Sequence, residues 1–256
     1  MIDTHAHLNF SDFEKDYPEV IKRSQQEGVE KIINVGTKFD TSKKAIELAN
    51  KFSCLYASVG LHPIYVLDEK TDIKEYQEIA KDKKVVAIGE IGLDYYHQED
   101  KEIKDKQKEV FSLFLNLAKK ESLPVILHCR GSKDKPADAY QDILKIEGLN
   151  KIRGVIHCFT ANWQIAKRFL EKDFFIGFTG IITFASELNE VVRKVPLERI
   201  LTETDCPFLA PHPFRGRRNE PAYVKYVLEK IAEIKEISFN EVEKQTRANA
   251  YKLFSF

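Results

Sequence analysis

Short apolar runs recur along the chain, and longer stretches with helical periodicity separate them. Most runs are rich in β-branched residues, which is typical of buried strands. They predict strands over residues 2–7, 29–36, 54–60, 85–90, 124–128, 154–157, 174–178 and 200–205. The intervening stretches predict helices over about 11–27, 40–51, 72–81, 101–121, 137–147, 162–172, 186–194, 220–235 and 240–253.

Two of these helices have a start signal of their own. Ser11-Asp12-Phe13-Glu14 and Ser238-Phe239-Asn240-Glu241 place a serine three residues before a glutamate, which is the spacing of a capping box. We therefore expect the first helix to begin at this first box and to end at Gly28.

Strands that alternate with helices call for a parallel sheet that is buried on both faces. Eight such units in 256 residues match the size of a closed (β/α)8 barrel, so the predicted fold class is α/β, a TIM barrel. An open doubly wound sheet is the alternative, but no Gly-x-Gly-x-x-Gly turn follows any strand. No linker or change in composition marks a boundary, and we expect one domain over residues 1–256.

Composition narrows the class of protein. The 40 basic and 40 acidic side chains balance, which argues against a protein that coats nucleic acid nonspecifically but leaves room for a local basic patch. The four cysteines occur singly, so neither a disulfide framework nor a zinc ribbon is indicated. No run approaches the ~20 apolar residues of a membrane span, and Ile2 already belongs to a strand. We expect a cytoplasmic enzyme without a signal peptide.

Polar residues interrupt the apolar runs where the predicted strands end, and in a parallel barrel those ends meet at one rim. The residues are His5, His7, Glu90, His128, His157 and Asp205. His5 and His7 alone could each be satisfied by a backbone carbonyl. Six such groups on one rim are too many to leave unpaired, and a metal is the simplest shared partner.

Six donors exceed the three protein ligands of a typical catalytic zinc and suit two ions about 3.5–4 Å apart. Binding of a single ion is the alternative. Asp3 and Glu203 share the inward face at a deeper level, so we expect them to support the ligands rather than to bind metal. Three cysteines each directly follow a proposed ligand: Cys129, Cys158 and Cys206. Because side chains alternate along a strand, we expect them to face the helix layer and to pack there as small apolar residues.

Several motifs, in order along nearly the whole chain, closely resemble the TatD family of metal-dependent deoxyribonucleases. They are Asp3-Thr4-His5-Ala6-His7-Leu8, Gly60-Leu61-His62-Pro63, Gly89-Glu90-Ile91-Gly92-Leu93-Asp94-Tyr95-Tyr96, His128-Cys129-Arg130, His157-Cys158-Phe159, Glu203-Thr204-Asp205-Cys206-Pro207 and Arg215-Gly216-Arg217-Arg218-Asn219-Glu220-Pro221. The resemblance implies an amidohydrolase-like barrel with two divalent ions.

By this resemblance the six rim residues divide between two ions. One ion is held by His5, His7, Glu90 and Asp205, and the other by Glu90, His128 and His157, with Glu90 bridging. Asp205 also orients or deprotonates the attacking water, so the expected catalytic residues are Asp205, Glu90 and His62. The ions are Mg²⁺, Mn²⁺ or Zn²⁺, because imidazole favours a transition ion whereas carboxylates and a phosphate suit the other two.

Candidate substrate contacts lie on the same rim. His62 is expected to donate to a scissile phosphate, and Asp94 to steer His62 or substrate, with loop capping as its alternative. A basic cleft is expected from Arg130, Arg215, Arg217 and Arg218, with additions from Lys133 and Lys135.

Other rim residues leave two readings open. Tyr95 and Tyr96 either stack on an unpaired base or pack against the next helix, and His97 is expected to be merely solvated. Residues 131–136 form a longer loop than the family usually has after its His-Cys-Arg motif, which bears on substrate choice rather than on metal binding.

The predicted function is hydrolysis of phosphodiester bonds in DNA, from the 3′ end of single strands, by a monomer that acts in DNA repair. The end preference and the role come from the resemblance alone. One alternative is hydrolysis of a C–N or ester bond in a small metabolite or aminoacyl-tRNA, which a narrow apolar pocket would favour. The other is a non-catalytic binding module, which the complete ligand set disfavours.

Overall fold

The eight predicted strands form one parallel sheet in the order β1 to β8. We describe them from a computed structural model that covers residues 1–256. The strands are β1 (Ile2–Ala6), β2 (Lys31–Val35), β3 (Leu55–Val59), β4 (Val85–Asp94), β5 (Val125–Arg130), β6 (Gly154–Ile156), β7 (Phe175–Phe178) and β8 (Ile200–Thr202).

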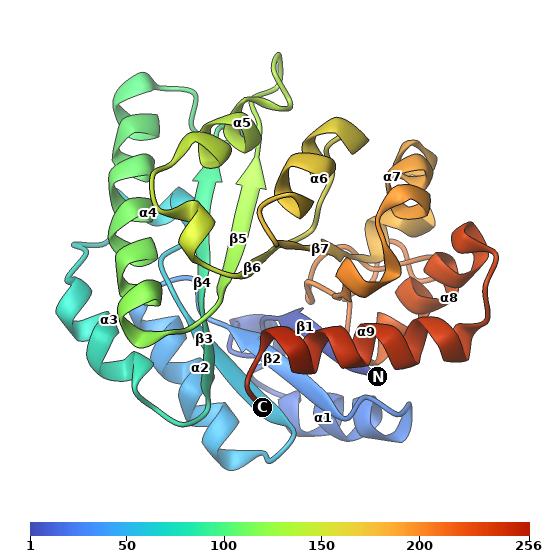
Figure 1. The fold of residues 1–256 in the computed structure, drawn as a ribbon. Coiled ribbons are helices and arrows are strands. Elements are labelled where there is room, and N and C mark those ends of the chain that lie inside the picture. Colours follow the sequence, from blue (N-terminus) through green and yellow to red (C-terminus); the bar gives the residue numbers. More distant parts are fainter.

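The helices alternate with the strands and lie outside them (Figure 1). They are α1 (Tyr17–Gln26), α2 (Phe39–Lys51), α3 (Ile73–Ala80), α4 (Lys101–Glu121), α5 (Asp138–Lys145), α6 (Trp163–Leu170), α7 (Asn189–Lys194), α8 (Val224–Lys235) and α9 (Phe239–Leu253). The predicted (β/α)8 barrel is therefore confirmed, and the open doubly wound sheet is excluded because consecutive strands are neighbours throughout.

The barrel closes between its last and first strands through few contacts. Ala6 and Cys206 form an isolated parallel bridge, and the Thr202 hydroxyl donates to the Ile2 carbonyl over 3.3 Å. Just beyond the strand ends, the Asp205 amide donates to the His5 carbonyl over 2.8 Å. This closure fixes the turn after β8 directly beside the end of β1.

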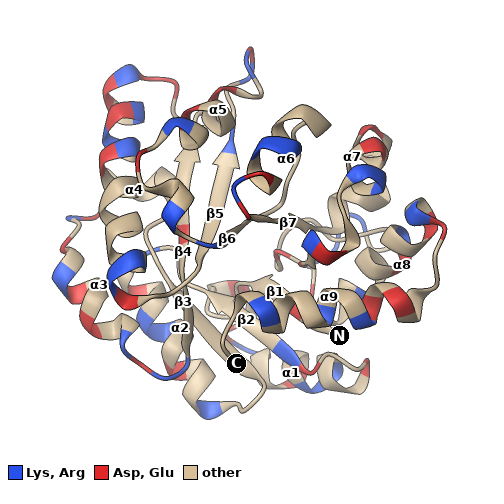
Figure 2. Cartoon of the chain, viewed as in Figure 1, with Lys and Arg blue, Asp and Glu red and all other residues tan.

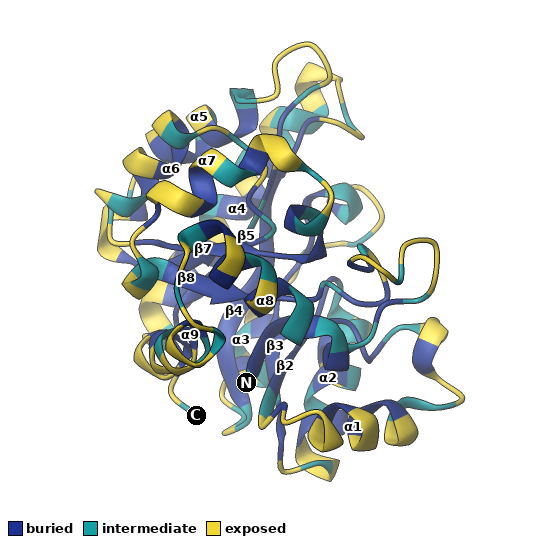
Figure 3. Cartoon of the chain, turned by 90° about the vertical axis from the view of Figure 1, so that its right-hand side faces the viewer, coloured by how far each residue is buried: buried dark blue, intermediate teal, exposed yellow.

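Alternate residues of the strands form two separate apolar cores, as the period of two in a strand requires. A large cluster packs between strands and helices, and a smaller one fills the barrel interior from most of the strands. The interior cluster also contains Ala250, Leu253 and Phe254, so the end of α9 closes one mouth of the barrel. Figure 3 shows the buried strands enclosed by helices whose outer surfaces are exposed.

Three predicted boundaries are wrong. The box at Ser11 forms only a 3₁₀ turn, η1 (Ser11–Phe13), without a side-chain cap, and α1 begins at Tyr17, where Pro18 suits the first turn. β4 continues through Asp94, so Glu90 lies inside the strand, where the register with β5 shifts between Ile88 and Ile91. β8 ends at Thr202, three residues before Asp205.

The second capping box is confirmed in part, because the Ser238 hydroxyl accepts from the Glu241 amide over 3.2 Å.

Lysines, arginines and acidic residues are interspersed over the outer helices in Figure 2. No helix in the structure combines the length and the apolar character that crossing a bilayer requires.

Asn249 ties α9 to the barrel, because its buried side-chain amide donates to the Leu197 and Ile200 carbonyls, each over 2.8 Å. We expect Asn249→Ala to lower the free energy of unfolding by about 1–3 kcal/mol, since both carbonyls lose this donor. Urea denaturation measures the change, with Lys244→Ala on the exposed face of α9 as the control. Equal midpoints for the two variants would contradict this role.

Candidate metal centre

All six rim residues converge at the carboxyl ends of the strands, where they line or adjoin a cavity of about 590 Å³. His5 lies in β1, Glu90 in β4 and His128 in β5, whereas the other three lie just beyond strand ends: His7, His157 and Asp205. The cavity is in the size range of small-molecule sites and opens to solvent. The sequence-predicted ligand set is therefore brought together in one place.

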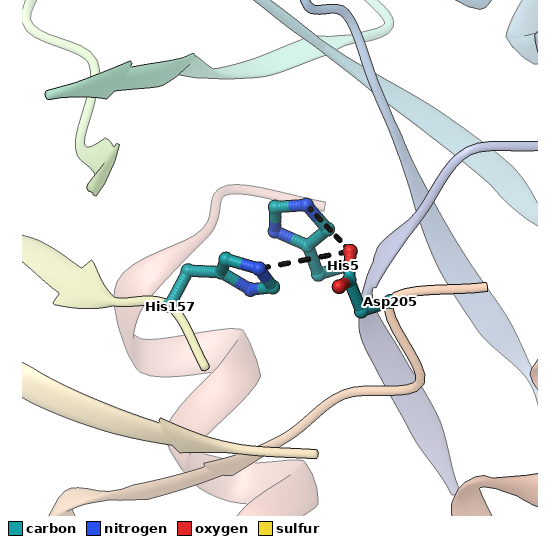
Figure 4. Close-up of side chains that lie close together, drawn as sticks. All are labelled: His5, His157 and Asp205. Carbon is teal, nitrogen blue, oxygen red and sulfur yellow. Dashed lines mark ion pairs between the residues drawn. The ribbon is translucent and has the colours of Figure 1, made fainter. Parts of the chain in front are cut away.

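His5, His157 and Asp205 form the first close group (Figure 4). Both histidines point Nε2 at Asp205 Oδ1, each over 3.7 Å. The two imidazole rings stack with their centroids 3.5 Å apart. The resemblance assigned His157 to the other ion, with Glu90 and His128, so the structure groups this residue differently.

His7 and Glu90 extend this group. His7 Nε2 lies 3.1 Å from His5 Nε2 and 3.3 Å from Asp205 Oδ1. Glu90 Oε2 lies 3.5 Å from His5 Nε2 and 3.9 Å from His7 Nε2. One oxygen of Glu90 thus faces the two histidines of the first motif.

The other oxygen of Glu90 faces a second group. Glu90 Oε1 lies 2.8 Å from His128 Nδ1 and 3.5 Å from His62 Nε2. A carboxylate whose two oxygens face different donor groups has the arrangement that a bridging ligand needs. The separation of the donors into two groups around Glu90 fits the prediction of two ions, without fixing their number.

Asp94 adjoins the second group instead of standing free for substrate. Its Oδ2 accepts from His128 Nε2 over 3.0 Å and lies 2.9 Å from His97 Nδ1. Its Oδ1 accepts from the Tyr96 and His97 amides, so the predicted alternative of loop capping is present. His97 was expected to be only solvated; it is half exposed, but it also holds Asp94.

A buried carboxylate orients His157 from below. Glu203 Oε2 accepts from His157 Nδ1 over 2.8 Å and from the Cys158 amide over 3.0 Å. Gly177 in β7 makes room for it, because a Cβ there would lie 2.3 Å from Glu203 Oε1. This is the supporting position that strand alternation predicted for Glu203, since such partners fix the ring and its proton.

Asp3 supports the turn after β8. Its carboxyl accepts from the His5 amide over 3.2 Å and from the Thr204 amide and hydroxyl over 2.9 and 2.6 Å. Burial raises the pKa of Asp3 to about 8. Asn219 completes the anchor by donating to the Thr204 carbonyl over 2.8 Å. Asp3 is outside the close donor groups, as expected of a supporting residue.

The fixed orientations of the rings test whether a cation fits. His7 Nδ1 faces the Val35 carbonyl over 3.0 Å, which can only accept, so this nitrogen carries a proton and Nε2 points inward. His157 is held in the same sense by Glu203. His5 Nδ1 is buried without a partner. Inward-facing imidazole nitrogens beside two carboxylates are the donor set of a divalent metal, and the residues present fit such ions.

The two carboxylates are held in their charged forms. Burial alone would raise the pKa of Glu90, but His62 and His128 are among the neighbours that hold it well below its usual range. Burial also opposes the charged form of Asp205, whose pKa is nevertheless lowered, mainly by His157. The centre therefore keeps its negative charge at neutral pH and attracts cations.

Two histidines respond to that charge. Burial alone would lower the pKa of His128, but its hydrogen bonds to Asp94 and Glu90 raise it to about 9. Burial likewise opposes the protonation of His157, whose pKa the charge of Glu203 helps to raise to about 9. Protons on these two rings offset part of the carboxylate charge in the metal-free protein, and bound metal would displace them.

His62 differs from the other histidines. Its Nδ1 accepts from the Ile64 amide over 3.2 Å, and burial lowers its pKa to about 3, so the ring is neutral with its proton on Nε2. Although His62 lies near Glu90 and His128, a protonated Nε2 is a donor and not a metal ligand. This arrangement favours the hydrogen-bonding role predicted for His62.

The comparisons with known proteins agree with the motifs. The sequence profile of the family described as TatD related DNase matches residues 2–255. The chain belongs to this family. The predicted resemblance is thereby confirmed over almost the whole length.

Relatives of this TatD-family chain match it from end to end. YabD of Bacillus subtilis, named an uncharacterized metal-dependent hydrolase, is 45% identical over 99% of this chain and 98% of its own. The crystal structure of YjjV, a TatD homologue from Escherichia coli, is 32% identical with a TM-score of 0.87, over 100% of this chain and 98% of its own. The Escherichia coli phosphotriesterase homology protein, 13% identical with a TM-score of 0.67 over 98% of this chain and 97% of its own, shares the fold.

The prediction that the arginines after β8 form part of a basic cleft is wrong. Arg215, Arg217 and Arg218 follow β8, yet none lines the cavity. Arg218 pairs with Asp16, with an Nη2-to-Oδ2 distance of 2.6 Å, and Arg215 stacks over the ring of Phe184 at 3.5 Å. The turn directs these side chains to the outer surface, which strand order alone does not indicate.

Arg130 is the one predicted basic substrate contact that lines the cavity. Its guanidinium lies 3.9 Å from the ring centre of Tyr96, and Lys133 lies 5.4 Å from the same ring. Tyr95 instead is buried with its hydroxyl on Asp142. Packing is therefore the outcome for Tyr95, while Tyr96 is on the rim.

The 131–136 loop folds back onto α5. Ser132 donates to Asp138 through its amide over 3.0 Å and through its hydroxyl over 2.8 Å. Gly131 lies so close to Pro136 that a Cβ would be 2.2 Å from its carbonyl oxygen. None of residues 131–136 lines the cavity, so Lys133 and Lys135 stay outside it.

The predicted direction of the cysteines fails at Cys158. This residue lines the cavity and its sulfur lies 3.4 Å from the Thr179 hydroxyl, because β6 ends at Ile156 and the backbone of Cys158 is left-handed with φ 44°. Cys129, inside β5, packs in the cluster between strands and helices as predicted but also lines the cavity, and Cys206 is fully buried. Strand alternation does not extend past the end of a strand.

We expect Glu203→Gln to weaken metal binding by about 10–100-fold, because it removes the charge that orients the His157 ring. Calorimetric titration of the metal-free protein with Mn²⁺ or Zn²⁺ measures the affinity. Glu198→Gln, on the half-exposed turn before β8, is the control and should bind as the unaltered protein does. Equal affinities in all three proteins would contradict the supporting role.

Arg218→Ala should lower the free energy of unfolding by about 0.5–1 kcal/mol, as expected for a partly exposed ion pair with Asp16, and leave hydrolysis unchanged. Thermal denaturation and activity together test this expectation. Arg217→Ala is the matched control, because Arg217 is exposed and forms no ion pair. A large loss of activity with unchanged stability would instead support a substrate contact by Arg218.

Proposed function

We propose that this TatD-family protein is a metal-dependent hydrolase of phosphodiester bonds in DNA, acting on single strands from the 3′ end. The observation that carries the proposal is the convergence of four histidines and two carboxylates at one open cavity. The family description supports DNA as the substrate class. The preference for a 3′ end rests on the family resemblance alone.

Divalent ions bound at these donors would lower the pKa of a water and polarise a phosphoryl oxygen. Asp205 would orient that water and accept its proton; its position in the cavity lining and its lowered pKa, which keeps it ionised, support this role. The water oxygen forms a bond to phosphorus while the bond from phosphorus to the leaving oxygen breaks. That oxygen is finally protonated from solvent.

Three further residues are assigned roles in this reaction. Glu90, by facing both donor groups, keeps them in a fixed relation to one another. His62 presents a neutral Nε2–H at the cavity and would donate it to a non-bridging phosphate oxygen. Arg130 supplies the positive charge at the rim, where its planar guanidinium suits a neighbouring phosphate.

A second candidate function is hydrolysis of a C–N or ester bond in a small metabolite or aminoacyl-tRNA. The observation in its favour is the cavity lining, in which Arg130 is the only lysine or arginine and apolar side chains form much of the wall. The clusters of arginine that would have argued against a small substrate lie outside the cavity. Both functions use the same water and the same base.

The test is degradation of single-stranded DNA by the metal-loaded protein, with Mg²⁺, Mn²⁺ and Zn²⁺ assayed separately. Asp205→Asn should lower the rate by at least about a hundredfold, because it removes the base and weakens one donor group. Asp134→Asn, on the exposed rim loop, is the charge-matched control and should be fully active.

Small esters, amides and aminoacyl-tRNA are assayed beside DNA under the same conditions. Hydrolysis of these substrates with intact DNA would establish the second function instead of the first. Equal DNA degradation by the Asp205→Asn protein and the unaltered protein would refute the assigned chemistry.

A further inference from the structure

One large apolar side chain is exposed inside the cavity. Of the six large hydrophobic residues exposed anywhere on the chain, Phe208 alone lines the cavity, and 51% of it is accessible. Burying a phenylalanine side chain is favourable by about 1.5–3 kcal/mol. A ring left in the open at this position therefore has area available for a bound molecule.

The backbone holds Phe208 in place. Its amide donates to the Asp205 carbonyl over 2.9 Å, and its carbonyl accepts from the buried Asn219 side chain over 2.6 Å. The ring is thus fixed to the same short turn that carries Asp205. A molecule that stacks on this ring would therefore lie close to Asp205, the proposed general base.

Neighbouring rings support Phe208 from one side. Phe10 contacts it edge-on, with ring centroids 6.2 Å apart, and itself stacks on His7 at 4.5 Å. His7 also meets Phe208 edge-on, with centroids 6.4 Å apart. The ring is therefore braced along an edge by two aromatic groups and keeps accessible surface towards the cavity.

The two sides of the cavity differ in chemistry. Phe208 and Leu209 follow β8, and Phe10 and Ile181 line the cavity beside them. Arg130 ends β5, and in a barrel ordered β1 to β8 this strand lies across from the β8–β1 junction. The apolar, aromatic side of the cavity thus lies across from one guanidinium, that of Arg130, with carboxylates and histidines between them.

We propose that Phe208 is the stacking platform for the unpaired base of the nucleotide whose phosphodiester bond is cleaved. The inference rests on the proposed function and deepens it by assigning a binding position for the base. A nucleobase has a flat apolar face and is joined to an anionic phosphate. The base suits the aromatic side of the cavity, and the phosphate suits Arg130. A paired base is already stacked in its duplex, so the platform selects single-stranded ends.

The test compares two single-stranded oligonucleotides that differ only at the 3′-terminal residue, which carries adenine or an abasic tetrahydrofuran. Phe208→Ala should lower kcat/KM about tenfold on the adenine substrate, mainly through KM, which corresponds to about 1.4 kcal/mol. On the abasic substrate its kcat/KM should equal that of the unaltered protein. Phe208→Trp should keep the preference for the base, because stacking needs only an aromatic face.

Phe184→Ala is the matched control, because Phe184 is 40% exposed but lies outside the cavity. It should cleave both oligonucleotides normally. An equal loss on both substrates for Phe208→Ala, or no loss on either, would overturn the stacking role while DNA hydrolysis by the unaltered protein stands. Failure of the unaltered protein to cleave either oligonucleotide would overturn the proposed function and this inference with it.

Discussion

Glu90 is an ionised carboxylate buried between the two donor groups, and the surrounding side chains are arranged to satisfy its charge. An anion removed from water is costly unless charged or hydrogen-bonding groups surround it. Glu90 meets this requirement with histidines that come from other strands, including His5 from β1 and His128 from β5. Those rings come from strands far apart in the sequence, so this charge is satisfied only in the folded barrel.

The turn after β8 extends this arrangement to the surface. Asp3 and Asn219 both anchor Thr204, and the residue after it, Asp205, then reaches the histidines with its backbone in a left-handed conformation, φ 58°. The same turn places Phe208 at the cavity wall. One hydrogen-bonded turn therefore sets the position of the proposed base and of an exposed aromatic ring together.

Charge and apolar surface are separated across the cavity. The ionised carboxylates concentrate negative charge at its floor, where divalent cations would neutralise it before an anionic substrate could approach. Arg130 adds positive charge at the rim, and the arginines after β8 are engaged elsewhere, as Arg218 is with Asp16. The cavity therefore presents fewer cations and more apolar area than a rim lined by these arginines would provide.

Strand periodicity is a local property and predicted the barrel, and the meeting of parallel strand ends at one rim predicted which polar side chains would gather there. Alternation also predicted the inward direction of Glu203, which contacts His157 although it lies one residue past the end of β8. The folded chain was needed to set the directions of Cys158 and Arg218, because both lie past strand ends, where alternation no longer applies. It likewise decided that His128 is shared between Glu90 and Asp94, since that contact depends on β4 continuing four residues beyond Glu90.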